Sequence, residues 1–349
     1  MASRVVRWQR RHGRNDLPWQ ATRDPYRVWL SEIMLQQTQV ATVIDYFQRF
    51  TRRLPTLASL AAATEDDVLA LWSGLGYYSR ARNLHRCAVT VVERYGGVFP
   101  RDPQTLATLP GIGRSTAAAI ASLCFGERVA ILDANVRRVL TRLVAFDRDV
   151  SVAANTHALW DVASGFLPQQ DPARSMPRYT QGMMDLGATV CLARNPRCML
   201  CPLSDLCVAR KRGAPESFPV KTRKLRRSAQ SVWLLVAQDS SGAVWLERRP
   251  SRGVWGGLYC PPWFDSREAL SDALPDPHRA RLHDLEAVKH VLTHKDLHLH
   301  PVLLRLPVVS SGVPKGMRFP AAQWTELGLP APVRSLLYQL CSQPNEVTG

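Results

Sequence analysis

The sequence lacks a long hydrophobic run. No stretch approaches the roughly 20 apolar residues of a membrane-spanning helix, although 46% of the 349 residues are hydrophobic. The basic N-terminus also lacks the apolar core of a secretory signal, so we expect a soluble, cytoplasmic protein. An arginine-rich start is compatible with an organelle transit peptide as well, but Trp8 and Asp16 favour domain sequence.

Acidic residues are scarce relative to basic ones. The chain has 45 Lys plus Arg against 29 Asp plus Glu, a formal net charge of +16, and a pI of about 10.0. This imbalance favours a polyanionic partner, with nucleic acid first and a membrane surface second. The length exceeds that of one typical core and predicts two domains.

Cysteine is sparse outside one short segment. Four cysteines stand alone in apolar surroundings, which is typical of small buried hydrophobic residues: Cys87, Cys124, Cys260 and Cys341. The other four have the spacing C-x6-C-x2-C-x5-C: Cys191, Cys198, Cys201 and Cys207. In an intracellular chain this spacing indicates a metal centre before a disulfide, and by spacing alone zinc and an iron-sulfur cluster both remain open.

Helical periodicity fills residues 1–207. One helical segment starts with Asp24 as N-cap and Pro25 at the first position and continues through 40–47, and another starts at Asp133 and buries apolar residues over 136–143. Residues 208–228, with two prolines and dense Lys and Arg, predict a basic linker. Residues 229–349 indicate a smaller α+β domain, with strands expected at 231–238, 243–247 and 298–306.

A glycine-rich turn, LPGIGRST, occupies residues 109–116. Gly111 and Gly113 allow a tight turn and a close approach by another molecule, and a helix is expected from near Arg114. Its free amides and positive end favour a phosphate, so the turn would fix register on DNA without reading bases.

Two carboxylates suggest acid chemistry. Glu32 lies in a segment expected to be helical over 29–40, on a face with Val28, Trp29 and Leu35, and dehydration there would raise its pKa as a general acid requires. Asp133 at an N-cap is expected to stay ionised. One protonated and one ionised carboxyl suit cleavage of a glycosidic bond, although a solvated glutamate and an ordinary helix cap are the simpler alternatives.

Several segments together resemble the helix-hairpin-helix DNA glycosylases, specifically the MutY-type adenine glycosylases. They are SEIMLQQTQV, GLGYYSRARNLH, LPGIGRSTAAAI, LDANVRRVL, MMDLGATVC and the four-cysteine spacing, within the first 207 residues. The resemblance implies a mostly helical fold with DNA across a cleft and the target base flipped out. A later segment, VWLERRPSRGVWGGLYCPPW, resembles the family's Nudix-like C-terminal domain.

The resemblance also implies residue roles. Glu32 matches the acid that protonates adenine at N7, Asp133 the carboxylate that stabilises the cation, and Asn135 a residue supporting the sugar or the water. Gln37 and Tyr77 match residues that wedge into the duplex around the opposite base. The positions around the flipped adenine, of which the apolar ones could equally be core, are Trp19, Leu35, Val40, Ser115 and Gln181.

Two positions bear on the reaction type. Related endonuclease III-like enzymes carry a lysine where this chain has Ser115, and a hydroxyl cannot form the Schiff base that leads to strand cleavage. We therefore expect hydrolysis without strong lyase activity. Ala134 stands where the family usually has glycine, a change that would strain the turn at positive φ and be nearly neutral at negative φ.

For the cysteine loop the resemblance favours a [4Fe-4S] cluster over zinc, in a mainly structural role, with basic residues nearby that could meet phosphates: Arg194, Arg197, Arg210, Lys211 and Arg212. The Nudix-like domain lacks a glutamate-rich metal box, so we expect it to bind without hydrolysing. Thr293 and His294 match a loop that contacts 8-oxoguanine, although Leu292 replaces the usual phenylalanine; a metal site from the histidines at 290, 294, 298 and 300 is the alternative.

The expected function is that of a monofunctional adenine DNA glycosylase, a monomer acting on double-stranded DNA with adenine opposite 8-oxoguanine or guanine, in a bacterial nucleoid. Two alternatives remain: an endonuclease III-like glycosylase and lyase for oxidised pyrimidines, against which Ser115 argues, and a mispair-binding protein without catalysis, against which the retained Glu32 and Asp133 argue.

Overall fold

The computed structural model describes residues 1–222, 227–307 and 315–342, and the chain forms two compact units. The first comprises Met1–Ala62 and Asn83–Lys224, and the second Ala63–Arg82 and Leu225–Gly349. The units are therefore interleaved in sequence, while the expected domain boundaries at 207 and 228 stay a prediction. In the described part of the chain, no helix has the length and apolar character needed to cross a membrane.

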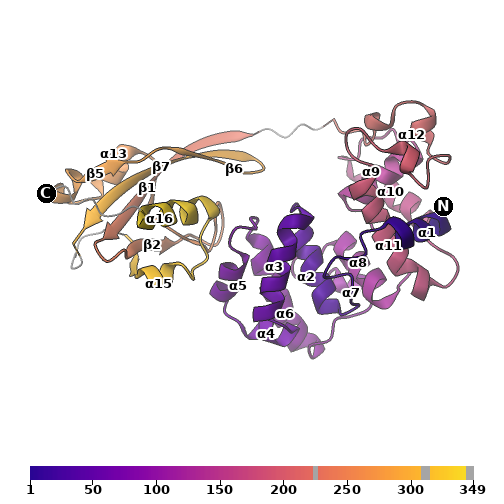
Figure 1. Cartoon of the computed structure of the whole chain (residues 1–349), viewed down its shortest axis with the longest axis horizontal. Coiled ribbons are helices and arrows are strands. Elements are labelled where there is room, and N and C mark those ends of the chain that lie inside the picture. Colours follow the sequence, from indigo (N-terminus) through magenta and orange to yellow (C-terminus); the bar gives the residue numbers. More distant parts are fainter. Residues whose placement is uncertain (223–226, 308–314, 343–349) are drawn as a thin grey trace. The chain divides into compact units, whose positions relative to one another are not determined.

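The first unit is built from helices whose ends carry the expected capping residues. Asp24 accepts a hydrogen bond from the Tyr26 amide with Pro25 in the first turn, and Asp133 accepts one from the Val136 amide at 2.8 Å. The elements are α1 Ala2–His12, α2 Pro25–Leu35, α3 Val40–Arg53, α4 Leu57–Ala62, α6 Ser79–Tyr95 (its first turn in the second unit), α7 Pro103–Leu106, α8 Arg114–Phe125, α9 Ala134–Leu143, α10 Ala153–Gly165, α11 Pro172–Thr189 and α12 Val208–Lys211, with short 3-10 turns at Cys198–Leu200 and Pro215–Ser217 (Figure 1).

The helix expected to run on from Pro25 is in fact two helices. It ends at Leu35, and the next begins at Val40, so the prediction of one helical segment over 29–40 was wrong. Between them Gln37 adopts a left-handed backbone with φ 58° and an exposed side chain. No glycine or proline marks this break, and tertiary structure sets it. The predicted helix after Asp133 is confirmed as α9, with the expected burial of Val136, Val139, Leu140 and Leu143.

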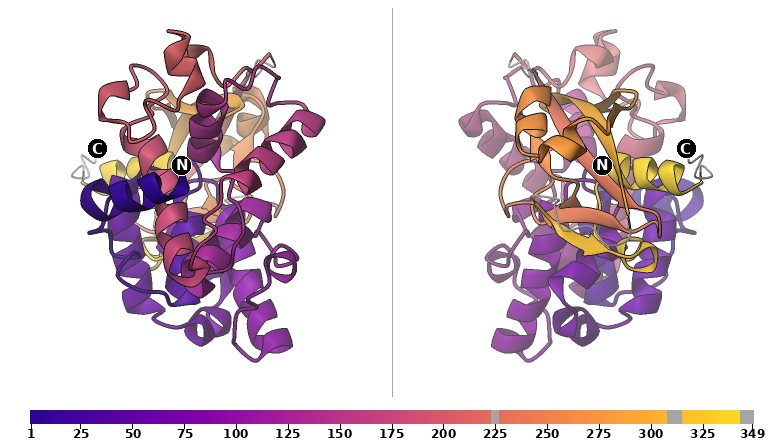
Figure 2. Two further views of the ribbon diagram at one scale, coloured as in Figure 1. Left: turned by 90° about the vertical axis from the view of Figure 1, so that its right-hand side faces the viewer. Right: turned by 90° about the vertical axis from the view of Figure 1, so that its left-hand side faces the viewer.

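Helix α11 packs closely on α9 and on α1 (Figure 2). A Cβ atom built on Gly187 would lie 2.6 Å from Asn135 Cβ, and one on Gly182 would lie 2.8 Å from Val5 Cγ1. Both glycines therefore allow helix contacts that alanine would obstruct. The contact at Gly187 sets the position of the first turn of α9.

The segment expected as a linker, residues 208–228, is folded along most of its described length. Helix α12 opens it, and Phe218 is buried against Ala145 and Ala209. The Thr222 amide donates to Asp149 Oδ2 at 3.2 Å. The many Lys and Arg residues favoured a linker in the sequence analysis, but a few apolar side chains among them pack against the first unit. Residues 223–226 lie outside the described part of the chain.

The second unit is a mixed sheet with short helices. Its strands β1 Ser228–Asp239 and β7 Lys295–Leu306 run parallel over twelve paired positions (Figure 1). Strands β1, β2 and β7 confirm those expected at 231–238, 243–247 and 298–306. The other elements are β2 Val244–Arg248, β3 Tyr259–Cys260, β4 Trp263–Phe264, β5 Leu282–Asp284, β6 Val288–Val291, β8 Met317–Phe319, α5 Glu65–Trp72, α13 Arg267–Asp272, α14 Asp276–Arg279, α15 Ala321–Trp324 and α16 Ala331–Ser342.

The segment 63–82 is attached to this sheet unit by polar contacts. Ser73 Oγ donates to the Leu329 carbonyl at 2.7 Å, and Arg248 Nη2 lies 2.8 Å from Asp66 Oδ1. The Arg82 guanidinium also donates to the Gly256 carbonyl. These contacts position the loop that follows α5, which carries Tyr77.

The isolated cysteines mostly behave as predicted. Cys87, Cys124 and Cys260 are buried, but Cys341 is exposed, so for that residue the prediction was wrong. The buried stripe of α16 consists of Val333, Leu337 and Leu340, and position 341 lies off that stripe.

Candidate active site and cluster loop

Glu32, near the end of α2, and Asp133, at the start of α9, line one cavity of about 850 Å³ in the first unit. Both are partly exposed to it. The structure thus brings together two carboxylates from distant parts of the sequence. The other residues expected at the site that line the same cavity are Trp19, Leu35, Gln37, Val40, Ser115, Asn135 and Gln181.

The environment of Glu32 favours its protonated form. Its helix is buried at Val28 and Trp29, which lie on the same face as the carboxyl. Burial first, and then the nearby charge of Asp133, raise the pKa of Glu32 to about 7. The expectation of a dehydrated acid is confirmed.

Opposing effects act on the carboxyl of Asp133. It is the N-cap of α9, as expected, yet burial raises its pKa above the ordinary value; that it stays ionised remains a prediction. The amides of Val136 and Asn135, and then Arg138 and Arg137, act in the opposite direction. The cap provides the expected hydrogen bond, while the cost of dehydration depends on the tertiary fold and cannot be read from the local sequence.

Ser115 supports the loop that carries Asp133. Its Oγ accepts a hydrogen bond from the Leu132 amide at 3.1 Å, whereas the N-cap of α8 is Gly113, without a side-chain cap. Ala134 is the first residue of α9 and is absent from the residues with positive φ. The substitution of the usual glycine therefore imposes no left-handed strain.

The glycine-rich turn has the form expected for phosphate binding. Gly111 adopts φ 76°, and α8 begins at Arg114. Gly111, Gly113 and Arg114 are all exposed, so the turn and the start of the helix are accessible. The Arg114 guanidinium stacks over Trp160, 4.0 Å from the ring centroid, which limits its freedom.

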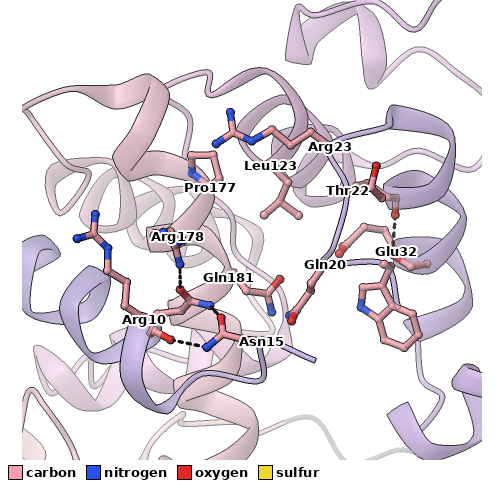
Figure 3. A pocket seen from close by; sticks show the side chains of 14 residues that line it. Arg10, Asn15, Gln20, Thr22, Arg23, Glu32, Leu123, Pro177, Arg178 and Gln181 are labelled. Atoms are coloured by element: carbon pink, nitrogen blue, oxygen red, sulfur yellow. Dashed lines mark hydrogen bonds between the residues drawn. The ribbon is translucent and has the colours of Figure 1, made fainter. Parts of the chain in front are cut away.

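A second cavity of about 450 Å³ shares Trp19, Glu32 and Gln181 with the first (Figure 3). Gln20 also lines it, and both polar atoms of its amide are buried without a hydrogen-bond partner among the described residues. Sequence reasoning missed Gln20. Its position directly after Trp19 was the available signal.

Sequence reasoning also missed an ion pair behind Gln181. Asp185 is fully buried and lies 2.8 Å from Arg14 Nη2. The Gln181 amide nitrogen donates to Asp185 Oδ1 at 2.9 Å. An acidic residue inside the otherwise apolar run MMDLG was the signal that could have found it.

The four-cysteine loop is joined to α9 by two arginines. Arg142 is buried and its Nη1 donates to Cys191 Sγ at 3.3 Å. Arg138 donates to the Cys191 carbonyl at 2.7 Å and to Asn135 Oδ1 at 2.8 Å. The first turn of α9 and the cysteine loop thus share one hydrogen-bond network.

The four thiols form a donor set that suits an iron-sulfur cluster. Burial raises the pKa of Cys201 to about 11, and the neighbouring thiols of Cys191, Cys207 and Cys198 contribute in the same direction, so the four lie near one another. In the parts of the chain that the structure describes, no three His, Cys, Asp or Glu side chains converge as a single-ion site.

In the second unit, Tyr77, Thr293 and His294 line a cavity of about 910 Å³. The Tyr77 hydroxyl lies 2.5 Å from Thr293 Oγ1, and Tyr77 has φ 48° after the turn at Gly74 and Gly76. Its side chain is 42% exposed, which suits a residue that contacts a partner. Among the histidines considered as metal ligands, His300 stacks on Trp233 with ring centroids 4.6 Å apart.

Comparisons with known proteins decide the family. The chain matches the HhH-GPD superfamily of base excision DNA repair proteins over residues 30–163. It is 35% identical over 339 residues to an adenine DNA glycosylase of Buchnera aphidicola (subsp. Acyrthosiphon pisum), covering 95% of each chain. This chain belongs to the adenine DNA glycosylase family.

Other similarities support that assignment. The human adenine DNA glycosylase is 47% identical over 317 residues, which cover 75% of this chain and 57% of the human one. A solved thermostable thymine-DNA glycosylase has a TM-score of 0.54 at 29% identity, covering 60% of this chain and 95% of that structure. The chain is thus an enzyme of base excision repair that acts on DNA.

Two further family models match outside the catalytic core. Residues 191–207 match the iron-sulfur binding domain of endonuclease III, and residues 232–339 match the NUDIX domain. This adenine DNA glycosylase therefore carries a [4Fe-4S] cluster and a Nudix-like C-terminal domain, and both predictions are confirmed.

Proposed function

We propose that this enzyme removes adenine opposite 8-oxoguanine or guanine by hydrolysis and leaves the DNA strand intact. The observation that carries the proposal is the cavity shared by Glu32 and Asp133. Membership of the adenine DNA glycosylase family establishes that the base is adenine and that the polymer is DNA. The roles of the individual residues, the opposite base and the absence of strand cleavage are the proposed parts.

In the proposed reaction, Glu32 donates its proton to N7 of the flipped adenine. A pKa of about 7 keeps much of this carboxyl protonated at neutral pH. As the glycosidic bond breaks, the Asp133 carboxylate stabilises the cation on the sugar. Asn135, held by Arg138 at 2.8 Å, supports the water that completes hydrolysis.

Hydrolysis without strand cleavage follows from the absence of an amine. Ser115 occupies the position at which related lyases have lysine, and no lysine is among the described residues that line the cavity of Glu32 and Asp133. A Schiff base needs a primary amine at the anomeric carbon. We therefore expect an abasic site as the product.

Recognition of the opposite base is proposed for the second unit. Thr293 and Tyr77 place two hydroxyls 2.5 Å apart at one cavity, with His294 beside them. Hydroxyl and imidazole groups can donate and accept, which suits the N7–H donor and O8 acceptor that distinguish 8-oxoguanine. Gln37 at the first cavity and Tyr77 are the proposed wedges around the opposite base. The Nudix-like domain is proposed to bind the base without hydrolysing nucleotides.

The cluster is proposed to be held by Cys191, Cys198, Cys201 and Cys207. When bound, it would cross-link the four cysteines and so hold the loop in one conformation. The basic residues of that loop are proposed to meet DNA phosphates together with Gly111, Gly113 and Arg114: Arg194, Arg197, Arg210, Lys211 and Arg212. The enzyme is proposed to act as a monomer.

One assay tests the proposal. Purified protein is incubated with duplexes that carry adenine opposite 8-oxoguanine, adenine opposite guanine, or thymine glycol, and each is analysed with and without alkali. Breaks that need alkali on the two adenine duplexes support the proposal. Breaks without alkali on thymine glycol would indicate the endonuclease III-like lyase, and tight binding without product would indicate a mispair-binding protein.

A further inference from the structure

The base in the pocket must be recognised by its hydrogen-bonding edge. Adenine presents an exocyclic amine at C6, whereas guanine and hypoxanthine present an oxygen there. A side chain that favours adenine must therefore offer an acceptor to this position. An acceptor would also disfavour an oxygen at C6, because two acceptors repel.

Gln181 is placed to offer that acceptor. It lines both cavities that Glu32 lines, and it extends into the space beside Gln20 (Figure 3). Its amide nitrogen donates to Asp185 Oδ1 at 2.9 Å, and Asp185 itself lines neither cavity. The amide oxygen is the acceptor that remains for a ligand.

Asp185 dictates this orientation chemically. It pairs with Arg14, whose Nε and backbone N lie 2.8 and 3.1 Å from its two oxygens. An ionised carboxylate only accepts hydrogen bonds, so the NH2 of Gln181 must face it and the reversed amide would place two acceptors together in a buried site.

The backbone around this pair is tightly fitted. A Cβ on Gly13 would lie 3.0 Å from Asp185 Oδ2 and 2.6 Å from the Gln9 carbonyl. The chain before Arg14 therefore approaches the carboxylate closely, and Asp185, fully buried, has little freedom to turn.

We propose that Asp185 is a positioning residue for base selection. Together with Arg14 it fixes Gln181 so that Oε1 accepts a hydrogen bond from the exocyclic amine of the flipped adenine and repels an oxygen at C6. This inference rests on the proposed function, because it places the base in the cavity of Glu32.

The test compares three bases in otherwise identical duplexes: adenine, purine, which lacks the amine, and hypoxanthine, each opposite 8-oxoguanine. Single-turnover excision rates are measured for the full chain and for Gln181→Met and Asp185→Asn. Only ratios between bases within one preparation are compared, so a loss of folded protein cancels. Asp205→Asn, at the exposed Arg4–Asp205 pair, is the matched control.

For Gln181→Met, the preference for adenine over purine should fall about tenfold, as expected for one lost hydrogen bond in a desolvated site. In Asp185→Asn, either orientation of the new amide places its NH2 against a donor of Arg14, because the guanidinium binds at Oδ1 and the backbone amide at Oδ2. The acceptor that fixes Gln181 at Oδ1 is therefore disturbed, and the glutamine amide can reverse. Hypoxanthine excision should then rise at least tenfold relative to adenine. Asp205→Asn should leave all ratios unchanged.

Equal losses on all three bases for Asp185→Asn would assign it a purely structural role and overturn the inference, as would an unchanged adenine-to-purine ratio for Gln181→Met. Failure of the unmodified chain to excise adenine from the 8-oxoguanine duplex is a separate result, because it would reject the proposed function itself.

Discussion

At the scale of single residues, the protonation of Glu32 should set the pH range of activity. Its pKa of about 7 means that the acid form declines as the pH rises through neutrality. Single-turnover adenine excision should therefore fall toward tenfold per pH unit above about 7. A rate that stays flat up to pH 9, with DNA binding intact, would remove Glu32 as the proton donor.

The same carboxyl should cost stability when it ionises. Its folded pKa is raised from 4.5 to about 7, so the folded state holds the proton more tightly and loses stability as the pH rises through that interval. Glu32→Gln should leave Tm unchanged near pH 4.5 and raise it by a few degrees at pH 8, about 1–3 kcal/mol. Equal Tm differences at both pH values would contradict this.

The direction of the pKa shift could be predicted from the sequence for Glu32 but not for Asp133. Apolar neighbours on one helix face sufficed to predict the raised pKa of Glu32. For Asp133 the local cap was read correctly, but its pKa depends on burial by segments far away in the sequence. The Arg14–Asp185–Gln181 contacts were missed for the same reason, since they join the chain start to α11.

At the scale of elements, the contact of α11 with α9 should control the active site without touching the substrate. Gly187→Ala would place a Cβ 2.6 Å from Asn135 Cβ and 2.9 Å from its carbonyl. The first turn of α9 would have to move, displacing Asp133 and Asn135. We expect a drop in single-turnover excision of tenfold or more, with helical circular dichroism retained.

The matched control is Gly165→Ala, at the end of α10, where an added Cβ would meet nothing within 4 Å. Its excision rate should stay within about twofold of the unmodified enzyme, since no contact is created. Comparable losses in both variants would mean that the helix contact at Gly187 does not govern the site.

Elements with strong local signals were predicted well. Helix α9 combines an N-cap with apolar spacing, and β1, β2 and β7 have strand-like composition. No glycine or proline marks the break between α2 and α3. In the segment 208–222, the buried residue Phe218 lies in a stretch of sequence rich in charged residues. Both features depend on packing between distant segments, which a local pattern does not encode.

At the scale of the whole molecule, the net charge of +16 should make DNA binding strongly dependent on salt. Each neutralised phosphate releases counterions, so a protein with 6 to 10 phosphate contacts loses roughly a thousandfold or more in affinity between 50 and 200 mM salt. Glu32→Gln allows the binding to be measured without turnover. An affinity that changes less than threefold over this range would contradict an electrostatic interface.

The cluster gives a second test on the whole chain. About four irons per chain and little zinc are expected by metal analysis. Cys201→Ala should lower the iron content and the visible absorption, while Cys87→Ala, at a buried cysteine outside the loop, should change neither. Full iron content in Cys201→Ala would remove that residue from the ligand set.

The hydrogen bonds of segment 63–82 should determine how the chain responds to proteolysis. Three residues from the first quarter of the chain are hydrogen-bonded to its C-terminal half. Ser73 and Tyr78 donate to the Leu329 carbonyl, and Arg82 donates to the Gly256 carbonyl. A protease that severs the chain after residue 222 would therefore yield two fragments that stay associated and elute together until a denaturant separates them.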